Sequence, residues 1–156
     1  MTKLFDAIKV LIAANIILYV ITFLMPGMET FMFEKFALYF PKNEKFSYWQ
    51  LITNMFMHGG FTHLLFNMYA LWAFGSPLEE MWGRNKFLVF YFVSGIGAGV
   101  IYTLVNYFQF NSIYQELINA GVSPAEILSL LETGKYGATS LSSFSETRLV
   151  EFYRLF

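Results

Sequence analysis

The segment 87–108 is predominantly apolar and contains no charged side chain. A helix needs about 20 such residues to cross the hydrocarbon core of a bilayer. Because backbone N–H and C=O groups cannot stay unpaired in hydrocarbon, an isolated spanning segment of this kind has to be helical. The segment therefore constrains the chain to an all-α, polytopic helical membrane protein more strongly than any other feature.

The composition agrees with a membrane protein. Of the 156 residues, 56% are hydrophobic and 21% aromatic, and only 13% are charged, against about a quarter in soluble domains. A net charge of −1 argues against a nucleic-acid partner. There is no cysteine to form a disulfide, and the only two histidines, His58 and His63, lack a third ligand for structural zinc. We therefore expect no nucleic acid, metal or cofactor.

Two further segments have the character of membrane spans. Residues 8–25 are apolar apart from Lys9 and two uncharged polar residues, and Lys9 can extend its ammonium group to the interface. A signal peptide is the alternative interpretation, but no small-residue cleavage site follows Met25, which favours a retained helix. With a further span at about 61–82, we expect three spanning helices, at about 8–25, 61–82 and 87–108.

The remaining segments are more polar. Residues 26–60 mix aromatic with charged side chains, which is typical of a loop at the membrane interface. Residues 109–156 contain no stretch that could span a bilayer, so we expect a helical tail outside the membrane. In this tail, Ser123-Pro124-Ala125-Glu126 predicts a capped helix start, and Gly134 predicts its end. A second short helix is expected from about 145 to 156.

Basic residues lie on one side of the predicted spans. Lys3 and Lys9 precede the first span, and Arg84 and Lys86 separate the second span from the third. The positive-inside rule places both flanks in the cytoplasm. We therefore expect a multi-pass protein with a cytoplasmic N-terminus, and with the interfacial loop and the tail on the outer side.

Two polar residues interrupt the second span. His63 and Asn67 are four residues apart, so on a helix they share one face. Polar side chains at membrane depth are costly unless they have a partner or a function. One interpretation is a hydrogen-bonding contact between helices, and the other is a chemical site. In the third span, Gly95 and Gly99 form a small-xxx-small pair that allows close approach of another segment.

The stretch from Trp49 to Gly83, WQLITNMFMHGGFTHLLFNMYALWAFGSPLEEMWG, resembles the rhomboid intramembrane serine proteases. The order of a loop, a His-x-x-x-Asn helix, a Leu-Glu turn and a Gly-rich helix is similar, over roughly the first 108 residues. The matching positions are Trp49, Thr53, Phe56, His58-Gly59, His63, Asn67, Phe74-Gly75, Leu78-Glu79, Gly83, Tyr91 and Ser94-Gly95.

The resemblance implies a serine endopeptidase that cleaves transmembrane protein substrates within the bilayer. In this family a serine nucleophile and a histidine base attack the peptide bond, a dyad variant of the Ser-His-Asp scheme. The family's second-helix His and Asn donate hydrogen bonds to the oxyanion, which implies that role for His63 and Asn67. We expect the membrane to be the bacterial inner membrane, with an organellar membrane as the alternative.

Six other positions are expected to support the site rather than to react. His58 precedes a Gly-Gly turn and is expected to bind backbone groups of the first loop. Glu79 is expected to bind loop backbone groups or the start of the third helix, with proton transfer as a lesser alternative. The supporting set is Trp49, His58, Glu79, Gly83, Gly95 and Gly99.

The chain departs from the family pattern in two respects. Gln50 follows Trp49 where the family often has arginine, so an arginine cannot anchor the loop. The Gly-x-Ser-Gly motif of the family nucleophile is also absent: the nearest stretch is Gly137-Ala138-Thr139-Ser140, and no histidine follows His63. We therefore expect the N-terminal half of a six-span rhomboid, inactive alone, whose later helices would pack on Gly95 and Gly99.

Two rival interpretations remain at this point. A non-proteolytic rhomboid-like protein would bind transmembrane clients without cutting them, although such a protein has no need of the pair His63 and Asn67. A small scaffold or transporter piece with a coincidental match would not require the two side chains to face a wet cavity. The presence of both donors favours the protease interpretation.

Overall fold

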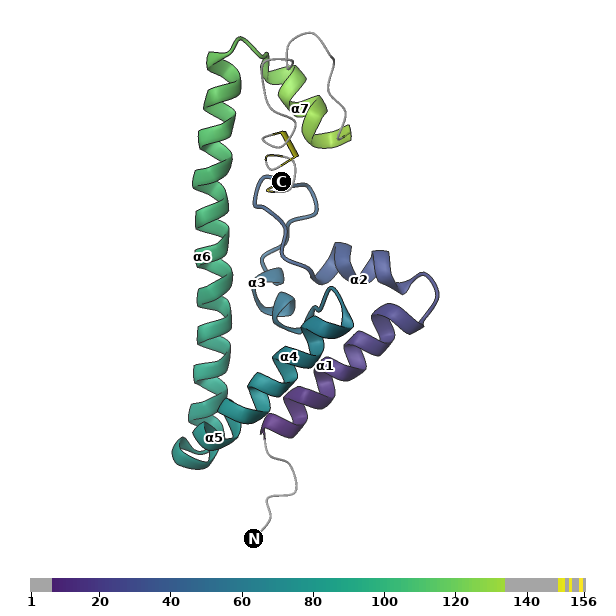
Figure 1. Cartoon of the computed structure of the whole chain (residues 1–156), viewed down its shortest axis with the longest axis vertical. Helices are drawn as coiled ribbons and strands as arrows, with labels where there is room; N and C mark the ends of the chain where they lie inside the picture. Colours follow the sequence, from purple (N-terminus) through teal and green to yellow (C-terminus); the bar gives the residue numbers. More distant parts are fainter. Residues whose placement is uncertain (1–6, 134–148, 151, 153–154, 156) are drawn as a thin grey trace. The chain divides into compact units, whose positions relative to one another are not determined.

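A computed structural model describes residues 7–133, 149, 150, 152 and 155 of the chain (Figure 1). The elements of these residues are helical and include no strand, which confirms the all-α prediction. In chain order they are α1 (Ala7–Leu24), α2 (Met28–Phe36), α3 (Gln50–Thr53), the 3-10 turn η1 (Asn54–Phe56), α4 (Phe61–Ala70), the π-helical turn η2 (Leu71–Gly75), α5 (Ser76–Trp82), α6 (Arg84–Asn119) and α7 (Pro124–Thr133).

The chain divides into two compact units. The first unit comprises residues 1–38 and 47–100, and the second comprises residues 39–46 and 101–156. The division falls within α6, which is a single helix of 36 residues. The predicted span 87–108 lies inside α6, which continues beyond the charge-free run as far as Asn119.

Two described helices, α1 and α6, are long and apolar enough to cross a membrane. The predicted span at 61–82 is helical throughout, but it is divided into the ten residues of α4, the five of η2 and the seven of α5. None of these pieces reaches the length of a membrane span. The count of three spans therefore stays a prediction, while the helical character of all three segments is confirmed.

The core of the first unit lies where α1 meets η2 and the start of α6. Ile8, Leu11 and Phe87 are buried there together with Ala7. The Ile8 side chain packs against Gly75, where an added Cβ would lie 2.5 Å from Ile8 Cδ1. A larger residue at this position would require the Ile8 side chain to move, so the glycine permits the packing.

Glu79 on α5 caps the beginning of α1. Its Oε1 accepts a hydrogen bond from the Ala7 backbone N–H at 2.7 Å, and its Oε2 accepts one from Ile8 at 3.1 Å. The first N–H groups of a helix have no partner within that helix, and their dipoles favour a carboxylate. The partner predicted for Glu79 is therefore wrong. The carboxylate binds the start of α1, whereas the sequence predicted that it would bind the loop or the start of α6.

Gly83 connects α5 to α6. Its φ of 81° lies in the region that favours glycine. Its N–H donates to the Glu79 carbonyl at 2.9 Å and ends α5, and its own carbonyl accepts from the Phe87 N–H at 3.1 Å and begins α6. One residue thus separates two helices, and the supporting role predicted for Gly83 at the site stays a prediction.

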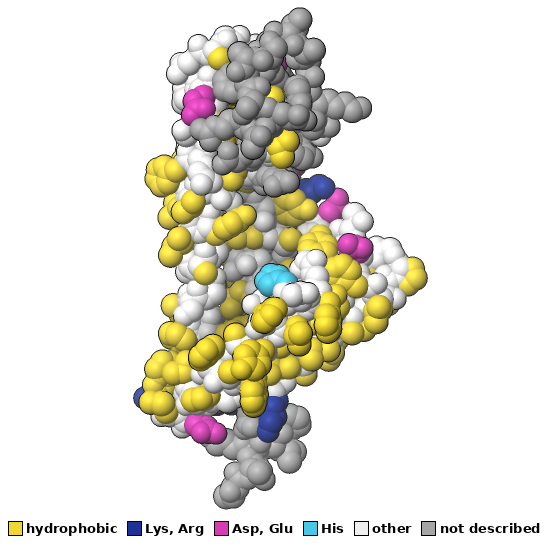
Figure 2. Space-filling model, in the orientation of Figure 1, with side chains coloured by type: hydrophobic (Ala, Val, Ile, Leu, Met, Phe, Trp, Pro, Cys, Tyr) yellow, Lys and Arg dark blue, Asp and Glu magenta, His cyan; other side chains and the backbone are white. Residues whose placement is uncertain are grey.

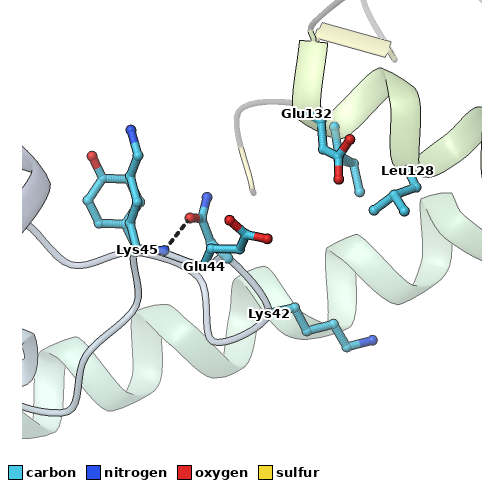
Figure 3. A pocket seen from close by; sticks show the side chains of 8 residues that line it. Lys42, Glu44, Lys45, Leu128 and Glu132 are labelled. Carbon is cyan, nitrogen blue, oxygen red and sulfur yellow. Dashed lines mark hydrogen bonds between the residues drawn. The ribbon is translucent and has the colours of Figure 1, made fainter.

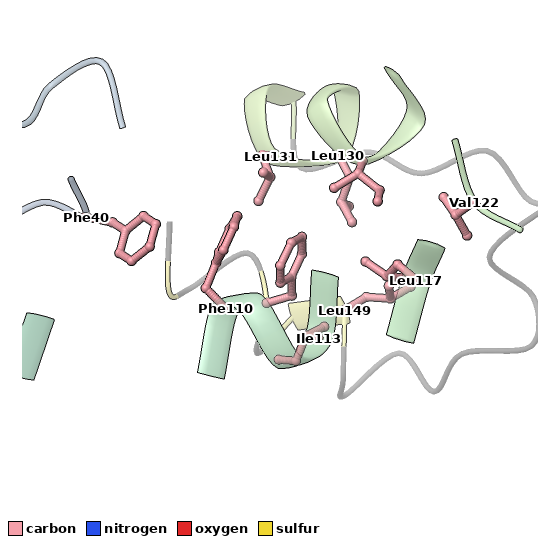
Figure 4. Packing of buried hydrophobic residues seen from close by; sticks show 10 residues of the cluster. Phe40, Phe110, Ile113, Leu117, Val122, Leu130, Leu131 and Leu149 are labelled. Carbon is pink, nitrogen blue, oxygen red and sulfur yellow. The ribbon is translucent and has the colours of Figure 1, made fainter. Parts of the chain in front are cut away.

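The second unit has its own hydrophobic core (Figure 4). Phe110 of α6 is central, with its ring 4.9 Å from that of Phe40 and 4.7 Å from that of Phe152. The other buried members are Ile113, Leu117, Val122, Ile127, Leu130, Leu131 and Leu149. Residues 39–46 of the loop therefore belong to the same packed core as the tail.

The start of α7 follows the sequence prediction. The Ser123 N–H donates to Glu126 Oε2 at 2.9 Å, and the Glu126 N–H donates to Ser123 Oγ at 3.3 Å. This reciprocal pair is the predicted capping box. The described part of the helix reaches Thr133, and its predicted end at Gly134 lies outside the described residues. The described residues of the predicted C-terminal helix, 149, 150, 152 and 155, are helical, and the others lie outside the described part.

Candidate functional site

The candidate site lies on α4, which begins directly after the Gly59-Gly60 pair. The Leu64 N–H donates to the Gly60 carbonyl at 3.1 Å and closes the first turn. Leu64 is buried, whereas His63 and Asn67 are both exposed. Because the two residues are one helical turn apart, their side chains leave the helix on the same exposed face.

The two side chains keep their donors available. Among the described residues, neither His63 nor Asn67 has a hydrogen-bond partner. The space-filling view shows histidine at the surface, in cyan, with hydrophobic side chains around it (Figure 2). An imidazole N–H and an amide NH₂ group on one accessible face can both donate to a single incoming oxygen. The described contacts therefore give no support to the alternative of an internal helix-to-helix hydrogen bond.

His58 lies directly behind this face. It is buried, its ring centroid lies 5.2 Å from that of His63, and its Nδ1 lies 3.3 Å from the Phe56 carbonyl oxygen. A carbonyl oxygen only accepts, so Nδ1–H is the donor. Burial lowers the pKa of His58, the Phe56 carbonyl partly opposes this, and the nearby His63 lowers the pKa further. The contact of the ring with the loop backbone fits the structural role predicted for His58, and that role stays a prediction.

Trp49 and Thr53 attach the loop to the end of α2. Trp49 Nε1 donates to the Lys35 carbonyl at 2.9 Å, and Thr53 Oγ1 donates to the Phe36 carbonyl at 2.9 Å. The last carbonyls of a helix lack partners within it, so these side chains complete the C-terminal turn of α2. Trp49 therefore holds the loop against α2, and its supporting role at the site stays a prediction.

In the sequence, Gln50 is only a departure from the family pattern. In the structure, its side chain helps to hold the loop. Its side chain is fully buried, and its Oε1 accepts from the Ser47 N–H at 3.2 Å. A neutral amide can be buried at lower cost than a guanidinium group. The loop is therefore held by uncharged hydrogen bonds, which explains how it is anchored without an arginine.

The glycine pair of α6 faces this same loop. A Cβ added at Gly95 would overlap the side chain of Met55, and one added at Gly99 would lie 3.6 Å from both Leu38 and Leu51. The predicted close approach is thus made within the chain, by the segment from α3 to η1. Met55 already fills the space at Gly95 that the sequence analysis assigned to later helices.

The other predicted elements of the site do not enter it. Gly137-Ala138-Thr139-Ser140 lies outside the described residues. Among the residues that the structure describes, no group of three or more His, Cys, Asp or Glu side chains could hold a metal ion.

A cavity of about 670 Å³ lies in the second unit, between loop residues 39–45 and α7 (Figure 3). Glu44 of the loop and Glu132 and Leu128 of α7 line it. The loop is shaped by a turn in which the Lys45 N–H donates to Asn43 Oδ1 at 2.9 Å, and the Lys45 ammonium lies 5.9 Å from the Tyr39 ring centroid. This cavity shares no residue with the His63 and Asn67 face.

Comparison with known proteins gives one family. The model of the rhomboid domain matches residues 45–127, which include α4 and both candidate donors. Putative rhomboid protease YdcA of Bacillus subtilis is 49% identical over 49 residues, or 31% of this chain and 25% of that protein. Rhomboid protease GluP of the same organism is 40% identical over 53 residues, or 34% of this chain and 10% of that protein.

A eukaryotic relative matches over a longer stretch. Rhomboid-like protease 3 of Toxoplasma gondii is 33% identical over 97 residues, which is 59% of this chain and 36% of that protein. The matches thus cover between a tenth and about a third of the length of these relatives. No solved structure gives a significant match.

Proposed function

Because the chain belongs to the rhomboid family of intramembrane proteases, we propose that it supplies the oxyanion-binding half of a serine endopeptidase that cleaves transmembrane protein substrates. Family membership and two long apolar helices make it an integral membrane protein. The observation that carries the proposal is the pair His63 and Asn67 on one exposed face of α4, whose side chains have no hydrogen-bond partner among the residues that the structure describes.

The proposed chemistry follows the dyad scheme. The serine hydroxyl oxygen attacks the scissile carbonyl carbon, and the C=O electron pair moves onto the oxygen. The histidine base takes the hydroxyl proton and later gives it to the leaving amine. The oxyanion accepts hydrogen bonds from the His63 imidazole N–H and the Asn67 amide N–H. Each such donor contributes about 3–4 kcal/mol when it is held in place before the reaction.

Buried His58 supports this role by holding the site from behind. Its Nδ1–H is bound to the loop backbone, and its ring centroid lies 5.2 Å from that of His63. A donor whose rotamer is limited by such a contact needs less reorganisation when the oxyanion forms. His58 is a positioning residue in this proposal.

The chain alone is proposed to be inactive. Its 156 residues contain no Gly-x-Ser-Gly motif, and no histidine follows His63. The nucleophile and the base would come from the polypeptide that corresponds to the remaining part of the relatives.

A chimera tests this function. Residues 1–108 are joined to the part of the Bacillus subtilis YdcA protein that follows its matched region, and cleavage of a transmembrane reporter is measured in liposomes. We expect cleavage by the chimera and none by the 156-residue chain. His63→Ala and Asn67→Ala should each slow cleavage by about 10²–10³-fold. Thr62→Ala, an exposed neighbour on α4, is the matched control.

Unchanged cleavage by the chimera carrying both alanines would remove the oxyanion role. Turnover by the 156-residue chain would show that a nucleophile lies within it. An inactive chimera that crosslinks to the reporter would favour the alternative of a non-proteolytic client-binding protein.

We further propose that the N-terminus lies in the cytoplasm of a bacterial cell, and that the loop before α4 faces outward. Lys9, Arg84 and Lys86 support this orientation through the positive-inside rule. The chain has no cysteine, so single-cysteine variants give an unambiguous assay. A membrane-impermeant maleimide should label Tyr48→Cys in intact spheroplasts and should label Asn85→Cys only after lysis. The reverse pattern would refute the orientation.

A further inference from the structure

A groove of about 610 Å³ lies on the first unit where α5 turns into α6. Trp82, the last residue of α5, forms one wall, and Gly83 turns the chain with its positive φ. The other lining residues lie along one side of the first turns of α6, and they are Asn85, Lys86, Val89, Phe90 and Val93. The groove shares no residue with the His63 and Asn67 face.

The long wall of the groove is apolar and uncovered. Val89 and Val93 are each 64% exposed, and Phe90 is 46% exposed. Trp82 packs edge-on against Phe90, with ring centroids 5.3 Å apart. Because residues 89 and 93 are one turn apart, this wall runs along the helix axis. A flexible hydrocarbon chain lying along α6 would fit such a wall.

The groove is polar and basic at the end nearest the start of α6. Asn85 and Lys86 line it, and Arg84 is adjacent. In the part of the chain that the structure describes, the Lys86 ammonium forms no ion pair or hydrogen bond. Of the two nearby carboxylates, Glu79 is bound to the start of α1 and Glu80 is exposed. An anion at this end would therefore meet uncompensated positive charge.

We propose that the groove binds one anionic phospholipid from the leaflet at the α5–α6 turn. The lipid phosphate contacts the Lys86 ammonium and the Asn85 amide, and an acyl chain lies along Val89 and Val93. The Trp82 indole lies at headgroup level, where tryptophan is enriched in membrane proteins. Basic pockets at helix ends recognise lipids of this class, since each basic residue attracts anionic headgroups.

Two other occupants fit the groove less well. Membrane helices associate through small residues, and the small pair on α6, Gly95 and Gly99, faces Met55 and its neighbours instead. A helix laid over the groove would also cover the Lys86 charge without supplying an anion, which is costly. A lipid is therefore favoured as the occupant of the groove over a second copy of the chain or a later helix of the same protein. This proposal does not depend on the protease function.

Native mass spectrometry of the detergent-purified 156-residue chain tests the proposal. The protein is given equimolar dioleoylphosphatidylglycerol and dioleoylphosphatidylcholine. We expect phosphatidylglycerol adducts in excess on the order of fivefold, as one lysine contact predicts. Lys86→Gln should remove the excess, whereas Lys35→Gln, an exposed lysine on α2, should keep it. Val89→Trp should fill the groove and reduce adducts of both lipids, with helix content checked by circular dichroism.

Equal retention of the two lipids, or an excess that survives Lys86→Gln, would overturn the proposal. So would an equal loss in Lys35→Gln, since that would indicate a diffuse charge effect. Dimers without lipid that disappear in Val89→Trp would identify a second copy as the occupant. Loss of phosphatidylglycerol binding in the chimera would identify a later helix as the occupant.

Discussion

Replacing Glu79 should loosen the first unit at the start of α1. The carboxylate accepts two backbone hydrogen bonds, from Ala7 at 2.7 Å and from Ile8 at 3.1 Å. A hydrogen bond to a charged group contributes about 1.5–3 kcal/mol, and a carboxylate at a helix N-terminus adds about 0.3–1 kcal/mol through the dipole. Glu79→Ala removes all of these contributions.

The expected loss is smaller than the sum, because the site is only partly buried. Water can reach the freed N–H groups and recover part of each hydrogen bond. We therefore expect Glu79→Ala to reduce the free energy of unfolding by about 2–3 kcal/mol. Glu79→Gln keeps one oxygen acceptor but no charge, so about 1 kcal/mol should be lost.

The measurement is unfolding in mixed detergent micelles, followed by circular dichroism. Glu80→Ala is the matched control, because it removes the same charge from the next residue, which is exposed. We expect Glu80→Ala to change the unfolding free energy by less than about 0.5 kcal/mol. The capping argument fails if the two alanine variants are equally destabilised, since the effect would then come from net charge.

The remaining predictions concern the loop and the site behind α4. Gly95→Val should lose about 1–3 kcal/mol of unfolding free energy, because its side chain would overlap Met55. Gly97→Val, which has open space in the structure, should be tolerated in the same assay, and equal losses would contradict the packing. Stability should fall as the pH drops below the unfolded pKa of histidine, about 6.5, because burial lowers the pKa of His58 in the folded state. The unfolded chain then binds the extra proton, so folding weakens with acid, and His58→Gln should flatten the slope between pH 7.5 and 5. Gln50→Leu should increase protease cleavage within residues 39–50, because the Ser47 N–H loses its acceptor, and an unchanged digestion pattern would argue against this anchor.

The elements that the sequence predicted well depend on residues close together in the chain. The capping box of α7 needs only Ser123 and Glu126, three residues apart, and the structure has both of its hydrogen bonds. The helical character of 8–25 and 87–108 follows from their own apolar composition. The shared face of His63 and Asn67 follows from their spacing alone.

The features that the sequence could not predict join distant parts of the chain. Glu79 binds backbone N–H groups 71 and 72 residues away. The sequence does not distinguish this partner, because the first N–H groups of every helix are equally suitable for a carboxylate. The pair Gly95 and Gly99 indicated close packing correctly, yet a small residue carries no information about what approaches it. Its neighbours are Met55 and Leu51 in the loop, a segment that the sequence placed only at the interface.

Several contacts hold the loop that lies beside His63, one of the two proposed oxyanion-binding residues. Met55 fits over Gly95, Trp49 and Thr53 hold the end of α2, and His58 binds the loop backbone beside His63. All of these contacts lie within the first unit. Of the residues in these contacts, His58 reaches a proposed donor, since its ring centroid lies 5.2 Å from that of His63. Under the proposed function, a nucleophile added from elsewhere would act beside a hydrogen-bond donor that this contact helps to position. Preorganisation is the condition under which two neutral donors stabilise a developing oxyanion strongly.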